Sequence, residues 1–387
     1  MITPAQVVPR RLLMTADTVG GVWVYALELC RALGPSGVEI ALATMGARLT
    51  SAQYSEVQSL PHVRLFESSY KLEWMDEPRA DVEQAGLWLL GLEQEFRPDI
   101  VQLNSYPHGA FPWRARKVVV GHSCVLSWWS AVRQADAPPE LEEYSESVMA
   151  GLHGADLVIA PSRAMLSALD EHYGPLRKSC VIPNGRSLPG MLFPPKQDLI
   201  FAAGRLWDEA KNISALVQVA PRLPWPVCLA GEDTRPNGRT QAHPGVNYAG
   251  RLSSQEMVRW YERASIYVLP ARYEPFGLSV LEAAIAGCAL VLGDIPSLHE
   301  VWGDAARFVP PDDTDALEKT IRELIDSRAT REALGAKARQ IAAAYTPENM
   351  AADYLAAYQS VLAEHLTPPI TMETAYANRD VLPHAAV

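Results

Sequence analysis

Two glutamates eight residues apart form a candidate ligand-binding pair. They lie in the segment Y-E-P-F-G-L-S-V-L-E-A-A-I-A-G, residues 273–287, where Glu274 precedes a predicted helix and Glu282 falls in its second turn. The apolar residues 266–269 before them are typical of a buried strand. Ligands of α/β proteins gather at the carboxyl ends of such strands, which favours a binding site here. The alternative is an acidic surface turn followed by a core helix.

The backbone at the start of the same helix is suited to an anion. Gly277 lets another molecule approach the chain closely, because it carries no side chain. The N–H groups of Gly277, Leu278 and Ser279 have no acceptor within the helix, so they can donate to a negatively charged ligand. The stretch from Arg272 to Gly287 therefore predicts both carboxylate and backbone contacts with one ligand.

At these residues the sequence resembles the retaining glycosyltransferases of family 4, which have the GT-B fold of two facing Rossmann-like domains. Glu274 and Glu282 match the family's E-x7-E motif, inside the wider pattern E-P-F-G-L-x-x-L-E-A-x-x-x-G. The resemblance implies that Glu274 lies against the reactive side of the transferred sugar. It also implies that backbone amides near Phe276 and Gly277 contact the sugar hydroxyls, and that Glu282 accepts hydrogen bonds from the nucleotide ribose. It covers about residues 10–363.

A second segment, A-G-R-L-W-D-E-A-K-N at residues 203–212, resembles the G-R-L…K part of the same family. By this resemblance Gly204 lies at the donor site, and Arg205 and Lys211 neutralise the donor diphosphate, whose charge grows as the glycosidic bond breaks. Many members have a shorter spacing before the lysine, so Lys211 matches less closely than Arg205. Solvated charges on a strand-to-helix turn are the alternative.

Shorter matches extend the resemblance along the second half of the chain. Gly231 ends a predicted strand where the family has a glycine-containing turn near the nucleotide. Arg251 and Leu252 stand where family members contact the base, largely through backbone groups. Residues 181–185, V-I-P-N-G, resemble the segment that enters the hinge between the domains.

In the first half of the chain, D-T-V-G-G at residues 17–21 joins the first predicted strand to the first predicted helix. Paired glycines at a helix N-terminus make room for a phosphate or a sugar oxygen. Alone they are more often mere turn geometry, but the family has a glycine-rich loop here beside the donor phosphates, which selects Gly21. The fingerprint G-x-G-x-x-G of nicotinamide enzymes is not met.

His122 follows a predicted strand of the first half, at the end where ligands gather. A lone histidine is usually structural, but the family often carries one on this loop near the donor sugar hydroxyls, and the resemblance implies the same contact for His122. Trp128 and Trp129 follow closely. They fit an apolar wall for an acceptor ring equally well as a place in the core or an interface.

Short apolar runs alternate with amphipathic helical stretches through most of the chain, which predicts βαβ units and parallel sheets buried on both faces. The pattern restarts after a stretch rich in proline and glycine near residues 184–196, typical of a connection between domains. The predicted fold is α/β, of the GT-B type. Its parts are an N-terminal Rossmann-like acceptor domain (1–184), a C-terminal Rossmann-like nucleotide-sugar donor domain (197–345), a helix crossing back to the first domain (346–365) and a tail (366–387).

The charge balance argues against a nucleic-acid partner, because 45 acidic and 34 basic side chains give a formal net charge of −11. Five scattered cysteines without a C-x-x-C pair favour reduced thiols, as in the cytoplasm. The N-terminal apolar run is too short for a signal peptide, and no run is long enough to span a bilayer. We therefore expect a cytoplasmic protein without a transmembrane segment, with peripheral membrane contact left open.

The expected reaction is retaining, metal-independent transfer of a hexose from a UDP- or GDP-sugar to a hydroxyl acceptor such as a glycan, a glycolipid or a small molecule. We expect neither a metal nor another cofactor, because no D-x-D motif follows a predicted strand and no side chains have metal-ligand spacing. Loops near residues 46–60, 68–80 and 104–116 should select the acceptor. The alternatives are a nucleotide-sugar epimerase or hydrolase of the same fold, and a non-catalytic sugar-binding protein.

Overall fold

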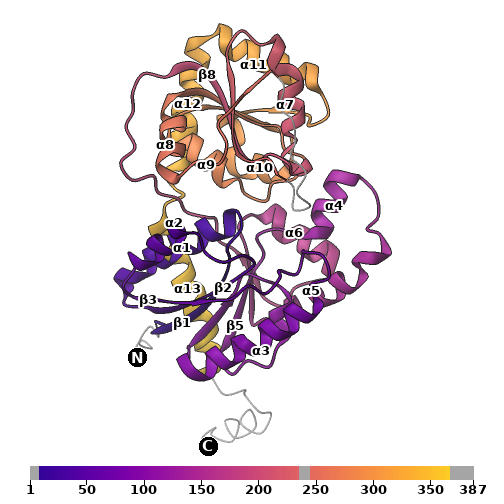
Figure 1. Cartoon of the computed structure of the whole chain (residues 1–387), viewed down its shortest axis with the longest axis vertical. Coiled ribbons are helices and arrows are strands. Elements are labelled where there is room, and N and C mark those ends of the chain that lie inside the picture. Colours follow the sequence, from indigo (N-terminus) through magenta and orange to yellow (C-terminus); the bar gives the residue numbers. More distant parts are fainter. Residues whose placement is uncertain (1–7, 235–244, 367–387) are drawn as a thin grey trace, which may run out of the picture.

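Seven parallel strands form the first sheet, in the order β3-β2-β1-β4-β5-β6-β7 (Figure 1). The structure is a computed structural model that describes residues 8–234 and 245–366. The order reverses between β1 and β4, which is the point where open α/β sheets bind ligands. The strands are β1 (Arg11–Asp17), β2 (Glu39–Met45), β3 (Val63–Glu67), β4 (Ile100–Leu103), β5 (Arg116–Val120), β6 (Leu157–Ala160) and β7 (Ser179–Val181).

Helices cover both faces of this sheet. Leu12 and Met14 of β1 belong to one apolar cluster, whereas Leu13 belongs to the cluster on the opposite face. Near-continuous apolar strands are the sequence signature of such a doubly covered sheet. The helices of this part are α1 (Gly21–Leu33), α2 (Ser51–Gln58), α3 (Arg79–Phe96), α4 (Val125–Arg133), α5 (Glu142–Gly154) and α6 (Arg163–Tyr173).

Six parallel strands form the second sheet, in the order β10-β9-β8-β11-β12-β13, around a core of its own. Its strands are β8 (Gln197–Arg205), β9 (Val227–Glu232), β10 (Asn247–Tyr248), β11 (Ala264–Leu269), β12 (Ala289–Gly293) and β13 (Ala306–Val309). Its helices are α7 (Ile213–Val219), α8 (Ser254–Arg263), α9 (Leu278–Ile285), α10 (Pro296–Trp302), α11 (Thr314–Asp326) and α12 (Arg328–Ala342). The chain thus has two Rossmann-like domains, as predicted.

The last helix, α13 (Pro347–Leu366), returns to the first sheet and lies beside α1 (Figure 1). The Tyr354 hydroxyl lies 2.6 Å from the Tyr25 hydroxyl in the core of the first domain. On its way the chain passes the other interdomain connection closely, because a Cβ on Gly185 would overlap the Thr346 carbonyl. The predicted crossover to the first domain is therefore confirmed.

One segment differs from the prediction. Residues 46–60, expected as a loop, contain α2, which begins with a capping box between Thr50 and Gln53. The expected tail, residues 366–387, lies outside the described residues except for Leu366. None of the helices in residues 8–234 and 245–366 has the length and apolar character needed to cross a membrane.

Candidate active site

The loop between β11 and α9 carries Glu274 at the carboxyl end of the second sheet. Gly277, the residue before α9, has φ of 90°, a left-handed conformation that favours glycine. A Cβ there would also lie 3.0 Å from a methyl group of Val280. The Phe276 N–H donates to the Glu274 carboxylate at 3.4 Å, and the Ser297 hydroxyl donates to the Glu274 carbonyl at 2.5 Å. These contacts hold Glu274 beside the first turn of α9.

Lys211 and Glu274, 63 residues apart in sequence, form an ion pair with 2.6 Å between Lys211 Nζ and Glu274 Oε2. Both side chains are largely buried, with 15% and 13% of their surface exposed. Lys211 ends a short 3-10 turn, η4 (Glu209–Lys211), that follows β8. The structure therefore brings together a cation and a carboxylate from two separate predicted motifs.

Arg205 ends β8 and bonds Asp208, with 2.9 Å between Arg205 Nη2 and Asp208 Oδ2. Its side chain keeps 39% of its surface exposed, whereas that of Asp208 keeps 4%. Burial alone raises the pKa of Asp208, but the charges of Arg205 and Lys211 and two N–H donors outweigh it and lower that pKa. Asp208 is thus an ionised carboxylate placed between Arg205 and Lys211, the two residues predicted to bind the diphosphate.

Glu282, on α9, bonds Arg186 of the interdomain connection at 2.7 Å, and Arg186 bonds Glu28 of α1 at 2.5 Å. Arg186 and Glu282 are each 13% exposed and Glu28 only 3%. Burial alone lowers the pKa of Arg186, but the two carboxylates outweigh it and raise that pKa. Sequence reasoning passed over Arg186, which directly follows the hinge-like segment P-N-G. Glu282, the residue predicted to bind the ribose, is therefore linked through Arg186 to the interdomain connection and to the first domain.

The glycine loop of the first domain meets the start of α9. Gly20 has φ of 84°, and α1 begins at Gly21. A Cβ on Gly21 would lie 3.5 Å from Leu278, in the first turn of α9 together with Ser279. The two predicted helix N-termini are therefore neighbours where the domains meet.

His122 follows β5 and lies with Nε2 2.9 Å from Asn104 Oδ1. The Asn104 amide nitrogen donates to the Thr15 carbonyl at 2.6 Å, which turns the amide oxygen toward the histidine. Since that oxygen can only accept, Nε2 carries the proton and Nδ1 is the acceptor nitrogen. The ring also packs against Tyr25, with centroids 4.4 Å apart. Burial lowers the pKa of His122 to about 3, so the imidazole is neutral near pH 7.

Asp17, at the end of β1, is a titratable group that sequence reasoning did not select. It accepts the Val19 N–H at 2.8 Å. Burial is the largest influence and raises the pKa of Asp17 to about 7, against the opposing hydrogen bond from Val19. The Glu73 charge adds to the rise, and Arg205 of the second domain reduces it. Asp17 therefore lies within electrostatic range of Arg205, a cation of the second domain.

The predicted nucleotide-side residues lie at the ends of β8 and β9. Gly204 and Gly231 are register partners, and a Cβ on Gly231 would overlap the Gly204 carbonyl. Gly231 N–H donates to the Gly250 carbonyl at 2.9 Å. Arg251 is exposed and pairs with Glu232 at 3.0 Å, and Leu252 packs against the second core. These residues adjoin Arg205 through β8, whereas His122 bonds Asn104 and packs against Tyr25 within the first domain.

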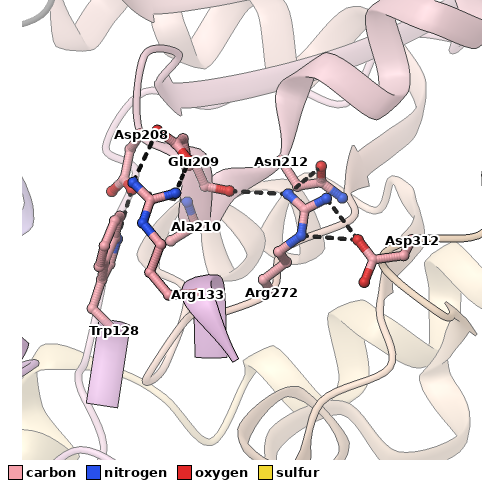
Figure 2. Close-up of polar contacts among 8 residues, drawn as sticks. All are labelled: Trp128, Arg133, Asp208, Glu209, Ala210, Asn212, Arg272 and Asp312. Atoms are coloured by element: carbon pink, nitrogen blue, oxygen red, sulfur yellow. Dashed lines mark hydrogen bonds and ion pairs between the residues drawn. The ribbon is translucent and has the colours of Figure 1, made fainter. Parts of the chain in front are cut away.

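The tryptophans divide between two settings. Trp128 Nε1 donates to Asp208 at 3.0 Å, across the domain interface, whereas Trp129 Nε1 donates to the Asp136 carbonyl within the first domain (Figure 2 shows Trp128). A polar recess of about 460 Å3 lies beside this contact. It is lined from both domains by Val132, Arg133, Gln134, Glu209, Ser214, Arg272 and Asp312.

Within the described ranges no group of three or more His, Cys, Asp or Glu side chains could hold a metal ion.

Two parallel Rossmann-like sheets with their predicted ligand residues at facing carboxyl edges define the chain as a GT-B protein. Family comparison agrees: residues 189–341 match the model for glycosyl transferases group 1, and residues 20–185 match the glycosyl transferase 4-like domain. The chain belongs to the group 1 glycosyltransferases, and it is an enzyme of that class.

Relatives and solved structures match over most of the chain. Glycogen synthase of Mycobacterium tuberculosis is 26% identical, covering 85% of this chain and 84% of the relative. Sucrose-phosphate synthase from Thermosynechococcus elongatus has a TM-score of 0.74 at 18% identity and covers 92% of this chain and 100% of that one. The Anabaena HepE protein, solved in complex with UDP and glucose, has a TM-score of 0.71 at 15% identity and covers 91% and 100%. The structural likenesses show the shared fold.

Proposed function

We propose that this chain transfers a hexose from a UDP- or GDP-sugar to a hydroxyl acceptor, with retention at the anomeric carbon. The observation that carries the proposal is the Lys211–Glu274 ion pair beside Arg205 and the start of α9. It gathers two cations, a carboxylate and backbone donors at one edge of the second sheet. The HepE relative, solved with UDP and glucose, supports this donor class.

The diphosphate is proposed to bind both cations, by replacing Glu274 as the partner of Lys211 and by joining Asp208 as a second partner of Arg205. In the structure Lys211 bonds Glu274 and Arg205 bonds Asp208. A guanidinium has five N–H donors, so Arg205 can hold Asp208 and a phosphate oxygen together. Lys211 can turn from the carboxylate to the phosphate, which leaves Glu274 negative where positive charge develops on the sugar.

In the proposed step, the bond between the anomeric carbon and the diphosphate oxygen breaks. The acceptor oxygen forms its new bond on the same face, and its proton passes to the departing phosphate oxygen. The Glu274 carboxylate stabilises the positive sugar, and the cations stabilise the leaving group. His122 Nδ1 accepts a hydrogen bond from a sugar hydroxyl, and Glu282 accepts bonds from the ribose. Gly21, Gly204, Gly231, Arg251, Leu252, Phe276, Gly277, Leu278 and Ser279 complete the donor site.

We propose further that no divalent metal is required. Arg205 and Lys211 supply the positive charge that a metal ion otherwise supplies to a departing diphosphate. The loops of the first domain, at the carboxyl edge that faces this site, are proposed to bind the acceptor.

Calorimetric titration with UDP-, GDP- and ADP-sugars tests the donor class, and we expect one of the first two to bind. Product formation should be unchanged by EDTA, and proton NMR of the product should show the donor's anomeric configuration. Failure of every nucleotide sugar to bind contradicts the proposal. Rapid donor consumption in the absence of any acceptor would instead identify an epimerase or hydrolase.

A further inference from the structure

The diphosphate loop, residues 205–212, is held from both domains at once. Figure 2 shows its acidic residues Asp208 and Glu209 contacted by Trp128 and Arg133, which belong to α4 of the first domain. The same loop carries the two cations proposed to bind the donor. Its geometry therefore depends on side chains that reach it only when the two domains are in contact.

Asp208 is the residue through which Trp128 acts. Its Oδ1 accepts the Trp128 Nε1–H and the Ala210 N–H, each at 3.0 Å, while its Oδ2 accepts from Arg205. The Ala210 bond makes Asp208 the cap of the turn that ends at Lys211. One buried carboxylate thus sets the position of both cations, and a first-domain N–H orients that carboxylate.

Arg133 forms an ion pair with Glu209, the residue after Asp208. Its guanidinium bonds both carboxylate oxygens of Glu209, at 2.5 and 3.3 Å, in the bidentate geometry that fixes direction as well as distance. The same guanidinium lies 5.2 Å from the Trp128 ring centroid and 5.7 Å from that of Trp129. This stacking holds Arg133 in place at the end of α4.

The opposite side of the loop is held within the second domain. Arg272 donates to the Asn212 side chain at 2.6 Å and to the Glu209 carbonyl at 3.3 Å, and it is itself paired with Asp312 (Figure 2). The Arg272 N–H also donates to the Ala210 carbonyl at 2.8 Å. These bonds are all made within the second domain, so α4 supplies the part of the support that comes from the first domain.

We infer that Trp128 and Arg133 are positioning residues: α4 places the diphosphate loop so that Arg205 and Lys211 receive the donor when the domains are closed. The inference rests on the proposed function, since it needs a diphosphate ligand for these cations. It assigns Trp128 to donor binding, through Asp208, and removes it from the acceptor site.

Trp128→Phe is the decisive variant, because it keeps an aromatic ring under Arg133 and deletes the N–H together with the second ring of the indole. Trp129→Phe is its matched control, since the Trp129 N–H reaches a carbonyl of its own domain. A hydrogen bond to a carboxylate predicts about a tenfold loss in UDP affinity and a similar rise in donor KM for Trp128→Phe. Acceptor KM should stay within about twofold, and the control should match wild type.

Arg133→Met should also raise donor KM, with Arg328→Met, an exposed arginine of α12 paired within its own helix, as control. In Asp208→Ala protein, which has no side-chain acceptor at this position, the Trp128→Phe change should have little further effect, because Trp128 acts through the Asp208 carboxylate. Equal behaviour of the two tryptophan variants overturns the inference, as does a rise in acceptor KM alone. Wild-type protein that binds no nucleotide contradicts the proposed function, whereas normal wild-type binding with unaffected variants contradicts only this inference.

Discussion

The two glutamates of the E-x7-E motif are each paired with a cation, but the two cations come from different parts of the chain. Glu274 bonds Lys211 of the same domain, whereas Glu282 bonds Arg186 of the interdomain connection, which continues to Glu28 of the first domain. The carboxylate proposed for the sugar is therefore set by one local loop. The carboxylate proposed to bind the ribose is positioned by the interdomain connection. The two glutamates of one short motif are therefore positioned by two separate structural elements.

Glu274→Gln tests the chemical half of this comparison and should have the largest effect. The amide keeps the size of the side chain but cannot stabilise a positively charged sugar, so we expect kcat to fall by at least about a hundredfold. Affinity for the nucleoside diphosphate, measured by calorimetry, should change by no more than a few-fold, because Lys211 and Arg205 are retained.

Glu282→Gln is the matched variant for the other half. We expect weaker nucleotide affinity with a smaller change in kcat, because a neutral amide is a poorer acceptor for ribose hydroxyls. If both variants lower kcat equally and leave binding unchanged, the two carboxylates do not have separate tasks.

Arg186→Met should mainly reduce stability. Removing the guanidinium leaves Glu28 and Glu282 buried without their common partner, and losing one member of a buried ion pair costs about 3 kcal/mol. Urea unfolding measures this change. Arg79→Met is a matched control, since Arg79 also pairs with two glutamates but is 75% exposed, and this variant should lose much less stability than Arg186→Met. Similar losses in the two variants contradict a special role for the hinge cluster, and adding Glu28→Gln should restore part of the stability of Arg186→Met.

The sequence predicted the fold, both glutamates and Lys211, but not Arg186. Apolar strands and helical periodicity are local signals, and they predicted both sheets and the last helix, whereas the return of α13 to the first domain was predicted from the family resemblance. The helix α2 was overlooked although its capping box, Thr50 to Gln53, is present in the sequence, because its apolar pattern is weak. Arg186 and Asp208 carry no such signal. The partners of Arg186, Glu28 and Glu282, lie far away in the sequence. Asp208 bonds residues close to it in sequence, but its partner Trp128 belongs to the other domain, so only the packed structure shows that contact.

His122→Asn should have an intermediate effect on activity, about a tenfold fall in kcat/KM, through loss of one hydrogen bond to a sugar hydroxyl. Burial lowers the pKa of His122 to about 3, so the ring stays neutral between pH 5 and 8. The ratio of wild-type to variant kcat/KM should therefore be the same at pH 6 and pH 8. A ratio that changes across this range means that the histidine titrates and takes part in proton transfer.

Asp17→Asn should give the smallest effect, on stability, and only at the higher pH. Because burial raises the pKa of Asp17 to about 7, the folded protein keeps a proton that the unfolded chain releases above about pH 4. Stability from this group therefore falls as pH rises from 4 to 7. The asparagine variant, which can still accept the Val19 N–H, should be more stable than wild type at pH 8, and the difference should disappear as the pH falls to 4. Asp326→Asn, at the exposed end of α11, serves as control. A stability difference that is independent of pH means that the Asp17 carboxylate is not desolvated, and that this edge of the first domain presents an ordinary charged group to Arg205.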